Sequence, residues 1–195
     1  MMRVACVLLM GGKSSRMGQD KAYLDYDGIS FWKQITDELK KCGETYLSVN
    51  STSNIPDTNH AIIFDEYEDI GPMGGIYSSL NALEEPLIFF APCDIPTITA
   101  EFIQAVIDEY EDGYDGIIVA SKTGKYYPTI GVYSKKILEH MRTQMEHKNY
   151  RLMNLIESAN VKVVSEEEIK VNSFELTNLN TPEEYEERKR QWNHR

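Results

Sequence analysis

A glycine-rich loop near the start of the chain carries the residue types most suited to phosphate chemistry. It runs over residues 9–21, directly after a continuous apolar stretch. Its adjacent glycines, Gly11 and Gly12, allow an anion to approach the backbone amides closely because no Cβ intervenes. The Arg16 guanidinium can donate two hydrogen bonds to phosphate oxygens, and the Lys21 ammonium can interact with them as a point charge. By itself, the loop fits a phosphate site and an ordinary surface loop about equally well.

Two better-known phosphate loops do not fit the spacing. A Walker loop needs a glycine five positions before its Gly-Lys-Ser/Thr, and Val7 stands at that position relative to Gly12. The dinucleotide fingerprint Gly-x-Gly-x-x-Gly is absent because Gly11 and Gly12 are adjacent and the next glycine is Gly18. The spacing therefore disfavours a P-loop NTPase and a nicotinamide-dependent dehydrogenase.

A carboxylate follows the apolar run of residues 87–91. Asp94 stands at the end of this expected strand, just before Ile95 and Pro96. A carboxylate there can hold Mg²⁺, which prefers oxygen ligands and keeps water and substrate phosphates as further ligands. The alternative is an Asp that caps a helix or shapes a turn. We interpret the neighbouring Cys93 as a packing residue, because a nucleophilic thiol needs a partner such as His and none is near in sequence.

Amide and acidic side chains follow other expected elements. Asn50 can donate and accept, and the carboxylate of Asp65 can accept paired N–H donors, although both lie in segments rich in turn-forming residues. Asn178 and Asn180 flank one residue of an extended segment, so they point to the same side. Asn180 and Thr181 can also serve as caps of the last helix.

The elements that position these residues alternate between strands and helices. Apolar runs predict strands at 3–9, 46–49, 61–64, 86–91, 116–120, 129–133 and 161–164. Apolar residues at helical spacing predict helices over 30–41, after 71–72, after Thr99, and over 135–145 and 151–157, with a terminal helix starting at Thr181. This alternation predicts a three-layer, Rossmann-like α/β fold with a mostly parallel central sheet. Ligands of such sheets bind at the carboxyl ends of the strands.

Composition and charge exclude several classes of protein. The 195 residues carry a net charge of −11, which disfavours nucleic-acid binding. The apolar run at the start is too short to span a membrane and runs into Gly11 rather than a cleavage site, so we expect neither a membrane protein nor a signal peptide. The three cysteines (Cys6, Cys42 and Cys93) form no C-x-x-C motif and indicate a reduced, cytoplasmic protein. With no linker or repeat, we expect a single domain over 1–195.

The motifs together resemble a known enzyme family. The loop Leu-x-Gly-Gly-Lys-Ser-Ser-Arg-Met-Gly-x-Asp-Lys is similar to the signature of the molybdenum cofactor guanylyltransferases, within the nucleotidyltransferase superfamily. The superfamily shares the loop and an Asp, whereas the late Asn-x-Asn-Thr-Pro-Glu stretch points to the guanylyltransferase branch. The chain departs from the family pattern at Met10, where alanine is usual, and at Met73-Gly74, which replaces Leu-Ala. The other family-like segments are 71–76, 92–96, 127–130 and 178–184.

The resemblance implies an activity and a set of site residues. The activity is transfer of GMP from Mg·GTP to the terminal phosphate of molybdopterin or its molybdenum-bearing form, with release of pyrophosphate. It implies that Arg16, Lys21 and Asp94 are catalytic, that Asp94 binds the metal, and that Asn178 and Asn180 are candidates for pterin binding. The GTP-binding residues that it implies are Leu9, Met10, Gly11, Gly12, Lys21, Asn50, Asp65 and Asp94.

The sequence is also compatible with other functions. It could be a related nucleotidyltransferase that uses another nucleotide base or another acceptor substrate, such as a molybdenum cofactor cytidylyltransferase or a sugar-phosphate nucleotidyltransferase. A non-catalytic nucleotide-binding module is a third possibility, although it would not need to keep Arg16, Lys21 and Asp94 together. The expected partners are GTP, molybdopterin or molybdenum cofactor, and proteins that deliver the cofactor, with no nucleic acid and no membrane.

Overall fold

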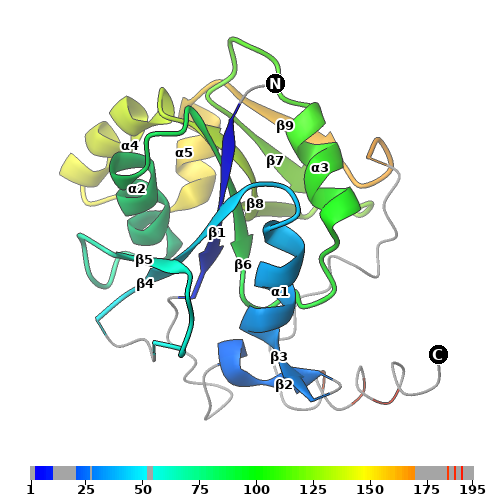
Figure 1. Ribbon diagram of the computed structural model, residues 1–195. Coiled ribbons are helices and arrows are strands. Elements are labelled where there is room, and N and C mark those ends of the chain that lie inside the picture. Colours follow the sequence, from blue (N-terminus) through cyan, green and yellow to red (C-terminus); the bar gives the residue numbers. More distant parts are fainter. Residues whose placement is uncertain are drawn as a thin grey trace.

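A mixed seven-stranded sheet forms the centre of the molecule (Figure 1). The computed structural model describes residues 3–10, 21–26, 28–51 and 55–169, together with Glu184, Glu187 and Arg190. The strand order is β5-β4-β1-β6-β8-β7-β9, and only β8 runs antiparallel to its neighbours. The strands are β1 (Val4–Leu9), β4 (Glu44–Val49), β5 (Ala61–Phe64), β6 (Leu87–Pro92), β7 (Gly116–Ala120), β8 (Tyr126–Ser134) and β9 (Val161–Ser165).

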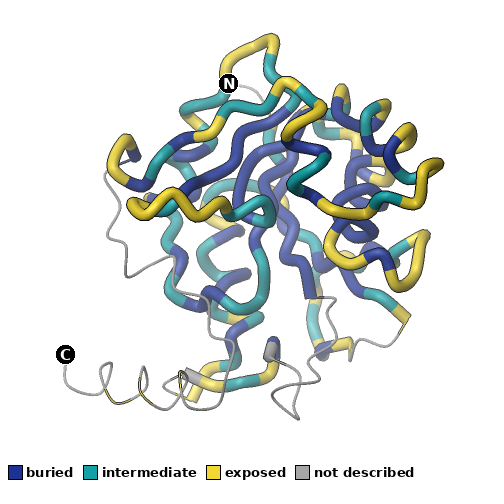
Figure 2. The backbone as a smooth tube through the Cα atoms, turned by 180° about the vertical axis from the view of Figure 1, so that it is seen from behind, coloured by how far each residue is buried: buried dark blue, intermediate teal, exposed yellow. Residues whose placement is uncertain are grey.

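Helices cover both faces of this sheet. The residues of α1 and α3 pack into one apolar core, and those of α2, α4 and α5 pack into a second core on the opposite face (Figure 1). Side chains of one strand alternate between the two, so that Cys6 and Leu8 of β1 enter the first core while Ala5 and Val7 enter the second. The buried residues accordingly follow the central strands in Figure 2. The helices are α1 (Phe31–Leu39), α2 (Pro72–Ala82), α3 (Ala100–Asp108), α4 (Ile137–Glu146) and α5 (Leu152–Ser158).

The predicted fold class is confirmed, and most predicted elements lie within a few residues of their observed bounds. The apolar runs produced strands because both faces of the sheet are covered, which leaves no polar face along the strand. Thr99 caps α3 as predicted, since its hydroxyl accepts a hydrogen bond from the Phe102 amide at 3.3 Å. Glu184, Glu187 and Arg190, which fall in the predicted terminal helix, are helical.

The strand predicted at 129–133 is longer than expected. It begins at Tyr126 and joins β7 through the short turn after Ser121, which makes β8 the antiparallel member of the sheet. The pairing with β7 is irregular across Pro128, where Ile118 pairs with Gly131 but Val119 already pairs with Tyr127. Proline has no amide hydrogen to donate to the ladder, so it fits this irregular stretch.

Three short elements were not predicted. They are a 3-10 helix, η1 (Lys21–Tyr23), and the two strands of a small hairpin, β2 (Asp25–Tyr26) and β3 (Ile29–Ser30). They follow the glycine-rich loop, and Ala22 in η1 is fully buried in the core on the α1 face. No helix within the described part of the chain is long and apolar enough to cross a membrane.

Candidate active site at the carboxyl edge of the sheet

The strand register brings several polar residues to one edge of the sheet. Leu9, the last residue of β1, pairs with Ser48 on one side and Pro92 on the other, and Val49 pairs with Phe64. The carboxyl ends of β5, β4, β1 and β6 therefore lie side by side. The residues that follow these ends are Asp65, Asn50, Met10 and the Cys93-Asp94 pair. Because β8 is antiparallel, its start reaches the same edge, next to the ends of β7 and β9.

Asp65 is fixed at this edge by two hydrogen bonds to β4. Its amide donates to the Val49 carbonyl at 2.9 Å, and its Oδ1 accepts from the Ser48 hydroxyl at 3.0 Å. Ser48 is buried, so this hydroxyl has a single defined direction. Burial raises the pKa of Asp65, and the Ser48 hydrogen bond opposes that rise by favouring the charged form. The carboxylate is therefore held in one orientation before any ligand arrives.

The first turn of α2 packs directly against this carboxylate. A Cβ added at Gly74 would lie 3.4 Å from Oδ2 of Asp65, and one added at Gly75 would lie 3.4 Å from Oδ1. The Cβ at Gly75 would also come within 2.4 Å of the Ser48 hydroxyl oxygen. The Glu66 amide donates to the Ser78 hydroxyl at 2.8 Å, which ties the segment after Asp65 to the same helix. The paired glycines therefore allow the helix to approach the Ser48–Asp65 pair.

Replacement of Gly75 by alanine is expected to destabilise the fold by about 1–3 kcal/mol, the usual cost of overpacking. The new Cβ would clash with the Ser48 hydroxyl and lie 3.0 Å from Cδ2 of Leu9, so Ser48 would have to turn away from Asp65. Urea unfolding measures the change, with Asn81→Ala on the exposed side of the same helix as the control. The control should differ from the parent by less than about 0.5 kcal/mol. Equal stabilities of Gly75→Ala and the control would contradict the close packing.

Leu9 and Met10 divide between the two faces of the sheet. Leu9 packs in the core on the α2 face, where a Cβ at Gly75 would touch it. The Met10 side chain, 3% exposed, packs in the core on the α1 face, and its amide donates to the Ser48 carbonyl at 2.9 Å. The bulk of methionine at the position where the family usually has alanine is thus accommodated in the protein interior. Asn50 lies half-buried just after β4.

Asp94 lies next to the end of β6, on the opposite side of β1 from Asp65. It is half-buried, and its Oδ1 atom is shielded from solvent. Tyr127, near the start of β8, is close enough to Asp94 for that charge to contribute to a raised pKa of the phenol, after burial and the charge of Glu166. Within the described ranges, no three His, Cys, Asp or Glu side chains gather to hold a metal ion. A divalent metal at Asp94 would therefore rely on substrate oxygens for most of its ligands, as Mg²⁺ commonly does.

Several predicted site residues lie outside the described residues. These are Gly11, Gly12 and Arg16 of the loop, and Asn178 and Asn180 near the end of the chain. For Lys21, only the backbone is described, as the first residue of η1.

Sequence reasoning missed three residues at this edge: Ser48, Tyr127 and Glu166. Ser48 gave no signal, because a serine inside a strand has no distinctive pattern. Tyr127 falls in one of the family-like segments but was not assigned a role. Glu166 is one of three consecutive glutamates, and the sequence does not tell which of them is buried.

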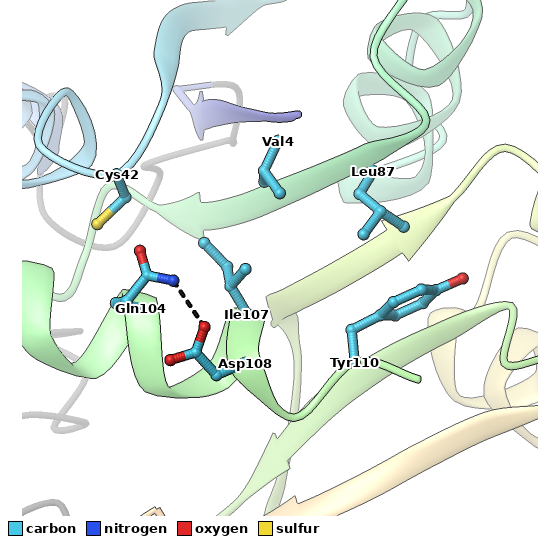
Figure 3. Close-up of a pocket in the computed structure, with 7 residues that line it drawn as sticks. All are labelled: Val4, Cys42, Leu87, Gln104, Ile107, Asp108 and Tyr110. Atoms are coloured by element: carbon cyan, nitrogen blue, oxygen red, sulfur yellow. Dashed lines mark hydrogen bonds between the residues drawn. The ribbon is translucent and has the colours of Figure 1, made fainter. Parts of the chain in front are cut away.

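A pocket of about 260 Å³ lies at the opposite edge of the sheet (Figure 3). It is lined by the first residues of β1 and β6, Val4 and Leu87, and by residues of α3 and the segment after it. Cys42 faces it with a thiol whose pKa is raised by burial and which donates to the Ala100 carbonyl at 3.4 Å. The pocket is therefore separate from the Asp65–Asp94 edge.

The chain is similar to proteins of one family along most of its length. A family model described as a MobA-like NTP transferase domain matches residues 6–163. The chain is 29% identical over 193 residues to a Bacillus cytotoxicus protein named "probable molybdenum cofactor guanylyltransferase", with 96% of each chain covered. It is 31% identical over 177 residues to a Flavobacterium johnsoniae protein of the same name, with 91% of this chain and 92% of that one covered.

The fold is similar to that of a solved structure. Molybdopterin-guanine dinucleotide biosynthesis protein A from Archaeoglobus fulgidus superposes with a TM-score of 0.84. The match covers 98% of this chain and 100% of that one at 16% sequence identity. At this identity, the likeness concerns the arrangement of the sheet and helices.

Proposed function

The chain belongs to the MobA-like NTP transferase family, and on that basis we propose that it transfers GMP from GTP to the terminal phosphate of molybdopterin or its molybdenum-bearing form. Pyrophosphate is the second product. The observation that carries this proposal is the similarity to guanylyltransferase-named relatives over 96% of the chain, which includes the whole Asp65–Asp94 edge. The arrangement of that edge supports it, because a carboxylate suited to a guanine edge and a carboxylate suited to a metal flank the end of β1.

In this reaction the acceptor phosphate attacks the α-phosphorus of GTP in line with the departing pyrophosphate. The acceptor phosphate is already ionised at neutral pH, so the protein needs no general base. Its contribution is to position both substrates and to offset negative charge. The amides of Gly11 and Gly12, together with Arg16 and Lys21, are proposed to stabilise the charge that passes to pyrophosphate.

We propose Mg²⁺ as the divalent metal and Asp94 as its protein ligand. The donor fits, since Mg²⁺ is usually bound by one or two carboxylates together with phosphates and water. When bound, the ion supplies charge neutralisation on the triphosphate. The shielded Oδ1 of Asp94 places the carboxylate in a setting where its charge is poorly screened by water.

Asp65 is the proposed reader of the base. Guanine presents an N1–H and an exocyclic amine side by side, and a carboxylate facing that edge accepts both. Adenine has an acceptor at N1 and no 2-amine, so the same carboxylate would face a lone pair. The Ser48 hydroxyl, which donates to Oδ1 at 3.0 Å, fixes the orientation that this recognition needs.

Replacement of Asp65 by asparagine is therefore expected to erode the preference for GTP over ATP. The parent should favour GTP by roughly 10²-fold or more in kcat/KM, because an unpaired buried charge is penalised more than a missing contact. Asn50→Ala is the matched comparison and should weaken both nucleotides more evenly. The measurement is the ratio of kcat/KM values for GTP and ATP with one pterin acceptor. An unchanged ratio in Asp65→Asn would move base selection to backbone groups at 9–11.

The acceptor and the cellular setting follow from the same proposal. The acceptor, molybdopterin or molybdenum cofactor, reaches the enzyme from proteins that make or deliver it. We place the reaction in the cytoplasm, where GTP is available, and the three cysteines are free thiols in keeping with that compartment.

Mass analysis of the reaction products tests the proposal. Incubation of the protein with GTP, Mg²⁺ and molybdopterin should yield a dinucleotide whose mass is that of molybdopterin plus GMP less water. A product that carries cytidine or a sugar would assign the chain to a related transferase. Nucleotide binding without any product would make it a binding module.

A further inference from the structure

Glu166 is a carboxylate at the same edge as Asp94, and the proposed reaction gives it no role. Glu166 follows β9, and its amide donates to the Ala120 carbonyl at 2.9 Å, which extends the pairing of β9 with β7 by one residue. Its side chain lies on the same face as Val164, because alternate residues of a strand share a face. Glu166 is only 1% exposed and Val164 only 2%.

The turn after β9 does not depend on this side chain. Glu168 closes the turn, since its Oε2 accepts from the Ser165 amide at 2.7 Å and its own amide donates to the Ser165 hydroxyl at 3.2 Å. The Ile169 amide also donates to the Ser165 carbonyl. Glu166 therefore turns inward without a structural task in the turn.

One oxygen of Glu166 is buried without a donor. The Lys122 amide donates to the carboxylate, but Oε2 accepts no hydrogen bond from any residue in the described ranges. Burial raises the pKa of Glu166, and the Lys122 amide and charge oppose that rise. A buried acceptor left without a donor is costly, so such atoms in native proteins usually serve a ligand or a water. The unsatisfied oxygen can therefore accept a hydrogen bond from a water or from a ligand that brings an N–H or O–H group.

Glu166 lies at the part of the edge where the acceptor substrate is expected to bind. The proposed nucleotide occupies the ends of β5, β4 and β1, and Asp94 stands at β6. In-line attack requires the acceptor to enter from the side opposite the pyrophosphate. The remaining part of the edge, formed by β8, β7 and β9, has no other role in the proposed reaction. Three strand spacings separate β6 from β9, or about 14 Å, which suits a bicyclic ring with a phosphorylated arm.

We propose that Glu166 is a specificity-determining residue that accepts hydrogen bonds from the amino-pyrimidinone edge of the pterin acceptor. This inference rests on the proposed function, which supplies the pterin as acceptor. A pterin presents a ring N–H and an adjacent exocyclic amine, the same donor pair that guanine offers to Asp65. The enzyme would then read its two substrates with two carboxylates at opposite ends of one sheet edge.

A metal ion is a poorer match for Glu166 than an N–H donor. Glu166 and Asp94 lack a third acidic, His or Cys partner among the described residues. The groups near Glu166 are instead Lys122, through its amide and its charge, and the phenol of Tyr127, whose pKa is raised by burial and by the charge of Glu166.

Binding of two fluorescent probes to the protein tests the inference without turnover. The probes are 6-(phosphonooxymethyl)pterin and the corresponding lumazine, in which a carbonyl oxygen replaces the 2-amine. The wild-type protein should bind the pterin roughly 10²-fold more tightly than the lumazine. In the lumazine, a carbonyl oxygen that cannot donate a hydrogen bond would face the Glu166 carboxylate. In Glu166→Gln the preference should fall below about threefold, since the amide can donate to the lumazine carbonyl.

Glu167→Gln is the matched control, because it makes the same change of charge at an exposed neighbour. It should keep the wild-type preference, and all three proteins should bind GTP equally and unfold at similar temperatures. Equal binding of the two probes by the wild type, no binding of either, or an unchanged preference in Glu166→Gln would overturn the inference. Failure of the proposed function is a separate outcome, namely no dinucleotide product from GTP and molybdopterin with the wild-type protein.

Discussion

Replacement of Asp94 by alanine is expected to abolish GMP transfer while leaving the fold intact. Asp94 is the carboxylate that follows β6, the strand next to the end of β1. Several negative charges meet where the acceptor phosphate approaches the α-phosphorus, and a metal held at Asp94 supplies the largest single charge that offsets them. The loss in kcat should exceed about 10³-fold, which is larger than the loss of a single hydrogen-bond donor.

The control for this experiment is Asp112→Ala, an exposed carboxylate beyond α3. It should keep the parental rate. Thermal unfolding of both variants should stay near that of the parent, because Asp94 is at the rim of the core rather than inside it. Retention of near-parental turnover by Asp94→Ala at saturating Mg²⁺ would show that the metal is held elsewhere.

Replacement of Lys21 or Arg16 by alanine is expected to lower kcat by about 10²-fold or more. A cation that strengthens its contact as charge moves to pyrophosphate contributes to the transition state, so its loss lowers the maximal rate. The backbone at Lys21 begins η1, whose next residue, Ala22, is fully buried, and this anchors the end of the loop to the core.

Lys33→Ala, which removes an exposed cation from α1, is the control and should leave kcat unchanged. Steady-state kinetics at saturating acceptor separate kcat from KM. If Lys21→Ala and Arg16→Ala raise only the KM for GTP, these residues hold the ground state and the assignment to the transition state is wrong.

The positions of Asp65 and Asp94 at the sheet edge could be predicted from sequence because each follows a continuous apolar run. A fully buried strand must end where polar residues begin, and parallel strands end at the same edge. The β8 start was predicted three residues late, since the Pro128 that interrupts its ladder also hides its first part in the sequence pattern.

The contacts that orient the site could not be predicted in the same way. The Ser48–Asp65 hydrogen bond joins residues 17 positions apart and depends on the pairing of β4 with β5, which periodicity does not reveal. Among Glu166, Glu167 and Glu168 only the first is buried, because β9 continues one residue further along β7 before the turn. A run of three acids in sequence gives no sign of that difference.

Pyrophosphate release from each of the four nucleoside triphosphates, with and without molybdopterin, tests the central claim most directly. The proposed function predicts Mg²⁺-dependent release from GTP that requires the acceptor, with much slower release from ATP, CTP and UTP. Faster release from CTP with the pterin, or release from any triphosphate that is independent of the pterin, would contradict the assignment of this chain as a guanylyltransferase acting on molybdopterin.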